Sequence, residues 1–162
     1  MLSRTAEYLY WISRYMERAE TTARLLDVGY RMSLFPNPSG YNNEWESVLS
    51  AAGAIEGYKN KYDTIEQKKV EDYLFFDESN PSSVYNCILN ARNNALVVRT
   101  SFTPESWLAI NKTYQEILKL KEKKFTKSDL PDLTEWTIEQ VNLFSCLLYT
   151  SDAADDALCV DL

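Results

Sequence analysis

The apolar residues in the first fifth of the chain recur at alternating spacings of three and four. Between residues 3 and 34 this pattern contains Leu9, Ile12, Met16, Ala19, Ala23, Leu26 and Tyr30. Because an α-helix turns by about 100° per residue, these side chains lie along one side of a helix and form a continuous apolar stripe. The pattern therefore predicts one long amphipathic helix, and other elements must pack against its stripe.

Helical start and stop signals divide the rest of the chain. FPNPSG (residues 35–40) predicts a loop, and Asn43 followed by Glu46 predicts a capped helix. GYKNKYD (57–63) reads as a polar connection before a short helix in TIEQKKVEDYLFF. Pro81 with Asn80 as its cap predicts a long helix through about residue 102, and Thr103 before Pro104 predicts another through about Lys121. A last helix follows Pro131.

No segment alternates apolar and polar residues as a strand does. The chain has four Gly, five Pro and 45% apolar residues, which is typical of a folded domain. We therefore predict an all-α fold, a helical bundle of about five or six helices that is truncated at its C-terminus.

The last seventeen residues, CLLYTSDAADDALCVDL, need separate treatment. Codons that encode them match the DNA of a transposase end and sequencing adapter over most of the segment, although an ordinary acidic tail is the alternative. We therefore expect residues 1–145 to be a partial helical domain and residues 146–162 to be an artefact tail. Without the four acidic residues of this tail, the net charge changes from −7 to −3.

Composition narrows the classes of function. The chain contains no His, which excludes Ser/His and Cys/His catalysis. Cys87, the one Cys outside the tail, is expected to be a packing residue. No apolar run is long enough for a membrane span, no signal peptide is apparent, and no basic stripe suggests nucleic acid. We expect a cytoplasmic protein without a cofactor or a metal.

A second set of residues on the first helix, here called the polar seam, also recurs at spacings of three and four. It comprises Glu7, Tyr10, Arg14, Glu17, Thr21 and Arg24, and it is flanked by Arg4, Trp11, Arg18, Glu20 and Asp27. One interpretation is a solvated face with ion pairs inside the helix. The other follows from the use of Arg rather than Lys beside aromatic residues, which favours partly buried pairs or a ligand site.

Two further arginines, Arg92 and Arg99, share one face of the predicted fourth helix because they are seven residues apart. Either they are solvated, or they cross to Glu7, Glu17 or Glu20 and fix the register between the two helices. We expect structural pairing more than ligand binding at these positions.

Several segments together resemble the bacterial alpha-E domain family of helical proteins. They are RTAEYLYWISRYMERAETTARLLD, EWESVLSAAGA, NPSSVYNCILNARNNA, VVRTSFTPESWLAIN and IEQVNLF. The resemblance covers residues 1–145. The positions that carry the family's motifs are Arg4, Glu7, Trp11, Arg14, Glu17, Arg18, Glu20, Arg24, Asp27, Asn80, Pro81, Ser82, Ser83, Arg92, Arg99, Trp107 and Asn111. Asn94 and Leu96 depart from the family's usual Glu and Arg.

The resemblance implies an accessory role, because genes of this family lie beside those of ATP-grasp ligases and transglutaminase-like proteins. This association implies peptide synthesis or modification, with the chain as a peptide-binding or scaffold component. Two alternatives stay open. One is a purely structural half-domain whose polar seam pairs with a second, similar helix. The other is an enzyme with an all-carboxylate Mg²⁺ site.

Overall fold

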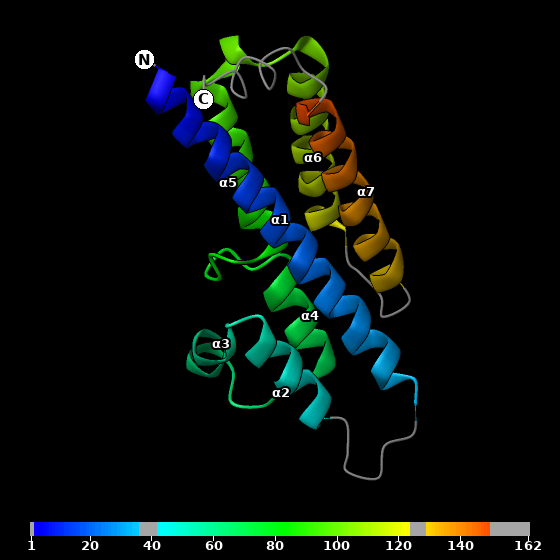
Figure 1. Ribbon diagram of the computed structural model, residues 1–162. Coiled ribbons are helices and arrows are strands. Elements are labelled where there is room, and N and C mark those ends of the chain that lie inside the picture. The colour runs from blue at the N-terminus through cyan, green and yellow to red at the C-terminus, as the bar shows by residue number, and fades with distance from the viewer. Residues whose placement is uncertain (1, 36–41, 124–128, 150–162) are drawn as a thin grey trace, which may run out of the picture.

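The computed structural model of the protein describes residues 2–35, 42–123 and 129–149, and every regular element in these ranges is helical. The all-α fold predicted from the sequence is thereby confirmed (Figure 1). The elements are α1 (Leu2–Ser33), α2 (Asn42–Ala51), α3 (Ile55–Lys61), α4 (Gln67–Phe75), α5 (Val84–Val97), the 3-10 turn η1 (Arg99–Ser101), α6 (Pro104–Glu122) and α7 (Leu130–Tyr149).

Four long helices form an antiparallel bundle. Helix α1 packs against α5 on one side and α7 on the other, and α6 packs against both α5 and α7. In Figure 1, α1 and α6 run downward whereas α5 and α7 run upward, so each helix is antiparallel to its two neighbours. Short connections favour this antiparallel arrangement for α5 with α6 and for α6 with α7, whereas α1 and α5 are joined through α2 to α4.

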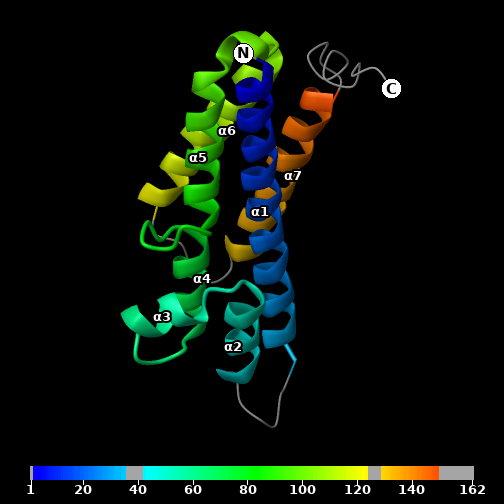
Figure 2. The ribbon, with the colours of Figure 1, turned by 60° about the vertical axis from the view of Figure 1, so that its left-hand side comes forward.

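The three short helices α2, α3 and α4 lie between α1 and α5 in the sequence. Figures 1 and 2 show them grouped at the lower end of the molecule, where α2 and α4 pack against the C-terminal half of α1. Helix α1 has 32 residues, so its upper half belongs to the four-helix bundle and its lower half supports this group.

The apolar stripe of α1 is buried as its spacing predicts. Ile12, Ala19, Ala23 and Leu26 are fully buried. Ile12 packs in the upper core with residues such as Ile110 and Phe144, whereas Ala19 and Leu26 pack in the lower core with Trp45, Leu74 and Ile88. Burial of a large apolar side chain contributes about 1.5 to 3 kcal/mol, so this stripe is a main source of stability. Among the described helices, none has the length and apolar character needed to cross a bilayer.

The described residues form seven α-helices where five or six were expected, and the structure corrects several boundaries. Asn43, the predicted cap, lies inside α2, and α5 ends at Val97 instead of about residue 102. Residues 57–63 do not form a polar connection, because α3 covers most of them and the ring of Tyr58 is fully buried. Its hydroxyl donates to the carbonyl of Thr64 at 2.9 Å, and its ring centre lies 5.3 Å from that of Tyr73. Aromatic packing and this hydrogen bond compensate for a polar sequence that contains Gly57.

The start of α5 is also later than predicted. Ser83, rather than Asn80, caps the helix and accepts a hydrogen bond from the backbone N–H of Asn86 at 3.2 Å. Asn80 instead accepts from the N–H of Ser82 and donates to the carbonyl of Tyr73. Thr103, by contrast, caps α6 as expected.

Helix α7 continues past Ser145 to Tyr149. The hydroxyl of Ser106 donates to the carbonyl of Leu147 at 3.3 Å, and Leu148 packs against the upper core. The rest of the segment that we interpret as an adapter-derived tail, residues 150–162, lies outside the described residues, as does the predicted loop at residues 36–40. The adapter origin of residues 146–162 stays a prediction.

Candidate functional site

A polar hollow of about 360 Å³ lies beside the middle of α1 and is here called the α1 hollow. Its volume is within the range of small-ligand clefts. Six of its residues come from α1 and three come from segments distant in the sequence. The lining residues are Arg14, Glu17, Arg18, Thr21, Thr22, Leu25, Ala51, Ala52 and Ser82.

The α1 side of the hollow follows directly from helical spacing. Arg14, Arg18, Thr21 and Leu25 are separated by four, three and four residues, so their side chains lie on one side of α1. The opposite side of the helix carries the buried stripe. The helical spacing within α1 is therefore sufficient to place these side chains on one wall of the hollow.

The other walls come from tertiary packing. Ala51 and Ala52, where α2 ends, are small and leave open space opposite α1. Ser82 lies just before α5, and its carbonyl accepts a hydrogen bond from the hydroxyl of Thr22 at 3.4 Å. The hollow thus forms where α1, the end of α2 and the start of α5 meet.

The segment that carries Ser82 is held by side-chain hydrogen bonds. The amide of Asn86 donates to the carbonyls of Asp77, Glu78 and Asn80 at 3.3, 2.9 and 2.8 Å. Asp77 accepts from the backbone N–H and the hydroxyl of Ser79 and pairs with Lys61. Burial disfavours ionisation of Asp77, but these hydrogen bonds outweigh it, so the pKa of this carboxyl lies below its ordinary value. This wall of the hollow is therefore preorganised.

Among the charged residues of the hollow, Arg14 and Glu17 form an ion pair with each other, whereas Arg18 does not take part in one with any described residue. Arg14 Nη1 donates to Glu17 Oε2 at 2.8 Å, and both side chains are more than half exposed. Arg18 is exposed as well, and it forms no ion pair with any described residue. Its positive charge acts on Cys87 of α5, although burial dominates there and raises the pKa of that thiol to about 12. Arg18 is thus a cation at the hollow without an anionic partner among the described residues.

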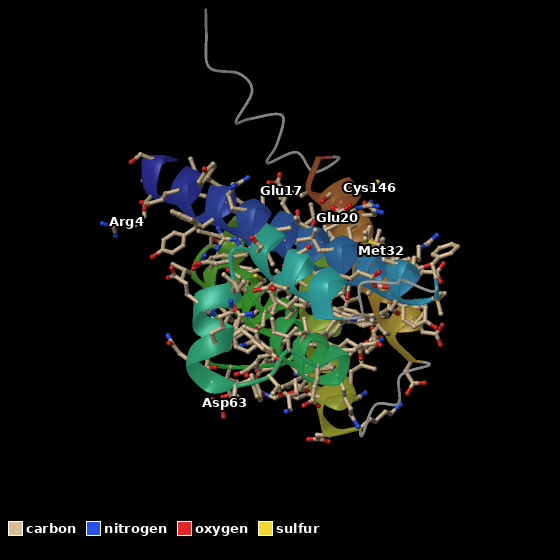
Figure 3. All side chains as sticks on the ribbon, turned by 90° about the horizontal axis from the view of Figure 1, so that it is seen from below. Arg4, Glu17, Glu20, Met32, Asp63 and Cys146 are labelled. Carbon is tan, nitrogen blue, oxygen red and sulfur yellow. The ribbon has the colours of Figure 1, made fainter. Side chains whose placement is uncertain are left out.

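The structure separates the predicted site residues into two groups. Of the twelve, only Arg14, Glu17 and Arg18 line the hollow. The others on α1 lie elsewhere on its surface: Arg4, Glu7, Tyr10, Trp11, Glu20, Arg24 and Asp27. Arg24 pairs with Glu20 at 2.6 Å, and Asp27 pairs with Arg31 at 2.9 Å. Figure 3 shows Glu17 and Glu20 along α1, at the opposite edge of the view from Asp63. Much of the polar seam is therefore a solvated face with ion pairs inside the helix.

The crossing predicted for Arg92 and Arg99 is wrong, because both contact α6 instead of the carboxylates of α1. Arg92 Nε donates to Asn111 Oδ1 at 3.3 Å, and its guanidinium lies 5.0 Å from the ring centre of Tyr114. The guanidinium of Arg99 lies 5.1 Å from the ring centre of Trp107. Stacking on an aromatic face satisfies an Arg without a buried carboxylate, so no charge has to be taken out of water.

The sequence did not reveal Thr22, Ala51 and Ala52 as lining residues. Thr22 lies beside the buried stripe and is 4% exposed, so periodicity assigns it to the core boundary. The two alanines carry no chemical signal of their own. Ser82, by contrast, belongs to the NPSS segment that the resemblance had already singled out.

The arrangement of the glutamates can be compared with the alternative in which the chain is an enzyme with an all-carboxylate Mg²⁺ site. Glu17 and Glu20 each pair with an Arg of the same helix instead of converging on one point. In the part of the chain that the structure describes, no three acidic or Cys side chains are grouped as metal ligands. The hollow is instead suited to an anionic group that the guanidinium of Arg18 can bind.

Comparison with known proteins points to one pair of residues in the hollow. Residues 1–158 match the family model Alpha-E, described as a predicted alpha-helical domain with a conserved ER motif. The chain belongs to the Alpha-E family. The single Glu-Arg dipeptide of this Alpha-E chain is Glu17 and Arg18, and both line the hollow. The match extends past Ser145, and neither the curated proteins nor the solved structures give a match.

Proposed function

We propose that this Alpha-E chain is an accessory, peptide-binding component and that the α1 hollow holds a carboxylate of the peptide. The observation that carries the proposal is Arg18, whose guanidinium has no carboxylate partner among the described residues and which lines the hollow together with Thr21 and Ser82. A guanidinium binds a carboxylate through two parallel hydrogen bonds. The hydroxyls of Thr21 and Thr22 already donate to the carbonyls of Glu17 and Ser82, so the recognition of the carboxylate rests on Arg18.

Glu17 adds a negative charge to the hollow beside the positive charge of Arg18. Its carboxylate pairs with Arg14 at the surface, where the pair is exposed and therefore weak. A ligand amine or amide N–H can share this carboxylate at little cost. A peptide, which carries donors and a carboxylate a few ångströms apart, fits the two charges better than a simple anion does.

The binding experiment compares peptides and matched variants by calorimetry. Tri-alanine with free termini is titrated against the protein, and its C-terminal amide serves as the ligand control. Because hydrogen bonds to charged groups are worth about 1.5 to 3 kcal/mol, Arg18→Ala should weaken binding about ten-fold or more. Arg24→Ala removes the same charge from an exposed pair outside the hollow and should leave affinity unchanged.

Circular dichroism of each variant verifies that the helices are retained. Equal binding of tri-alanine and its amide would show that the carboxylate is not recognised. Equal effects of Arg18→Ala and Arg24→Ala would show that net charge, rather than the hollow, determines affinity. Either result contradicts the proposal.

We further propose that the chain works in the cytoplasm with an ATP-grasp ligase and a transglutaminase-like protein. The support is the family resemblance together with the chemistry of the hollow, because both partner classes act on amide bonds. Co-expression with each candidate partner tests this: the partner should co-purify with the chain. Failure of both partners to bind the unmodified chain would count against the association while leaving peptide binding intact.

A structural role is the second candidate function, and the exposed residues of α1 favour it. Tyr10 and Trp11 are 58% and 44% exposed and contact each other edge to face. A second helix of similar sequence could cover these rings and the adjacent ion pairs. Under this hypothesis Arg14→Ala and Glu17→Ala lower the melting temperature of an assembly with that helix and leave peptide affinity unchanged.

A further inference from the structure

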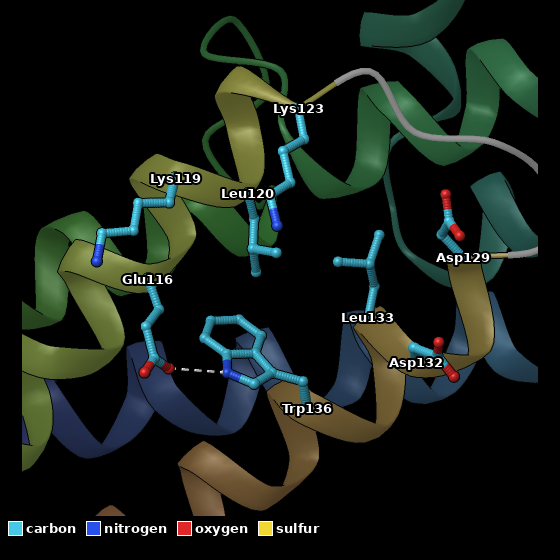
Figure 4. A pocket seen from close by; sticks show the side chains of 8 residues that line it. All are labelled: Glu116, Lys119, Leu120, Lys123, Asp129, Asp132, Leu133 and Trp136. Carbon is cyan, nitrogen blue, oxygen red and sulfur yellow. Dashed lines mark hydrogen bonds between the residues drawn. The ribbon is translucent and has the colours of Figure 1, made fainter.

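A second hollow, separate from α1, lies between the end of α6 and the beginning of α7 and is here called the α6–α7 groove. Its volume is about 580 Å³, again within the range of ligand clefts. Figure 4 shows Leu120 and Leu133 facing each other across an opening, with the indole of Trp136 beneath them. The centre of the groove is therefore apolar.

The indole is fixed in place. Trp136 Nε1 donates to Glu116 Oε2 at 3.0 Å, which joins α7 to α6 across the floor of the groove. This bond satisfies the one polar group of the ring, so its faces are left for apolar contact. A rigid aromatic surface between two leucines is suited to one aromatic or aliphatic side chain of a ligand.

The charges around this centre are divided by sign. Lys119 of α6 and Lys123 just after it lie on one side, and Asp132 of α7 and Asp129 just before it lie on the other. Glu116 of α6, the remaining charged residue of the lining, is engaged by the indole of Trp136. Figure 4 shows Lys123 extending toward the opening and Asp132 beside Leu133. Both Lys123 and Asp132 are exposed, and within the ranges that the structure describes neither forms an ion pair.

We propose that the α6–α7 groove binds a short peptide segment in which an apolar side chain lies between an acidic and a basic residue. The apolar side chain occupies the space over Trp136, the acidic residue faces Lys123, and the basic residue faces Asp132. This charge complementarity distinguishes the segment from a neutral peptide and from a peptide of one sign. The inference does not rest on the α1 hollow.

The probe is acetyl-Glu-Phe-Lys-amide, whose blocked termini leave only its side-chain charges, so the readout must show at which hollow it binds. The readout is the indole N–H resonance of Trp136, assigned by Trp136→Phe, with the resonance of Trp11 as an internal reference on α1. We expect a saturable shift of the Trp136 signal and no shift of the Trp11 signal. Acetyl-Gln-Phe-Gln-amide should bind about five-fold more weakly or worse, since exposed ion pairs contribute modestly.

Matched variants locate the charges. Lys123→Ala and Asp132→Ala should each weaken binding about three-fold, and both effects should diminish at high salt. Lys68→Ala and Glu135→Ala remove exposed charges of the same sign outside the groove and should change nothing.

Three outcomes would overturn the proposal. One is an unchanged Trp136 signal at millimolar peptide, and another is equal affinity for the neutral peptide. The third is a Trp136 signal that moves with protein concentration in the absence of peptide and is abolished by the same alanine variants, which would identify a second copy of the chain as the occupant. Loss of tri-alanine binding, in contrast, concerns only the α1 hollow.

Discussion

Gly29 shows how one residue determines the approach of two helices. It is buried within α1 at the contact with α2, and a Cβ placed on it would lie 2.8 Å from Val48 Cγ2 and 3.0 Å from Trp45 Cζ3. Both neighbours are buried and cannot move aside freely. The position therefore requires the absence of a side chain, although glycine is unfavourable inside a helix.

Gly29→Ala tests which effect dominates. Alanine gains about 1 kcal/mol from helix propensity, whereas overpacking a buried contact typically costs about 1 to 3 kcal/mol. We expect a net decrease in the free energy of unfolding, measured by urea denaturation. Val28→Ala, at an exposed neighbouring position, is the control and should change stability little. An increase in stability for Gly29→Ala would mean that α2 moves away at little cost.

A second prediction at the scale of single residues concerns the reactivity of the Cys87 thiol. Burial raises the pKa of its thiol to about 12, so at pH 8 only about one molecule in ten thousand carries the reactive thiolate. We expect iodoacetamide to leave Cys87 unmodified in the folded protein and to label it in urea. Peptide mass mapping distinguishes it from Cys146, which is exposed and should react in the folded protein. Equal labelling of both would show that α5 opens readily.

At the scale of elements, the segment between α4 and α5 depends on Asp77. The pKa of Asp77 is below its ordinary value of 3.8, so the unfolded chain takes up the proton first as the pH falls. The stabilisation is therefore fully present above about pH 4 and is lost as the pH drops through the lower pKa of the folded state.

Asp77→Asn should remove this dependence. We expect the variant to be less stable at neutral pH by about 1 to 3 kcal/mol, since it breaks a hydrogen-bonded ion pair with Lys61. Its stability should also vary less between pH 5 and pH 3, as followed by thermal melting. Asp63→Asn, an exposed carboxyl on the same end of the molecule, is the control. Parallel pH profiles for wild type and Asp77→Asn would contradict the assignment.

The elements also show what the sequence could and could not predict. Helix α1 and its buried stripe follow from local periodicity, and so do the positions of Arg14, Glu17 and Arg18. Helix α3 was missed because a polar segment with Gly57 becomes helical only when Tyr58 is enclosed by Tyr62 and Tyr73. The cap of α5 was misplaced because Asn80 bonds to distant Tyr73. The second wall of the hollow was hidden for the same reason: it depends on contacts between remote segments.

At the scale of the whole molecule, several large apolar side chains are exposed. Phe35, Leu34, Leu108 and Val97 are 71, 64, 67 and 60% exposed. Leu34 and Phe35 are adjacent in the sequence, and contiguous exposed apolar side chains favour association. We therefore expect the 162-residue chain to associate in solution.

Light scattering as a function of concentration tests this prediction. We expect the average mass to rise with concentration, and Leu108→Gln together with Phe35→Gln should reduce the rise without loss of helical signal. Lys68→Gln, which changes a polar exposed residue, should have no effect. A monomer at all concentrations with a sharp two-state melt would contradict the prediction.

The location of the α1 hollow has a consequence for dynamics. Helix α1 joins the four-helix bundle to the group of short helices, and the hollow is formed by α1, the end of α2 and the start of α5. A bound ligand must therefore be released before these three segments can separate. Occupancy should slow amide hydrogen exchange throughout α2 to α4, far beyond the residues it touches, while exchange in α6 stays the same.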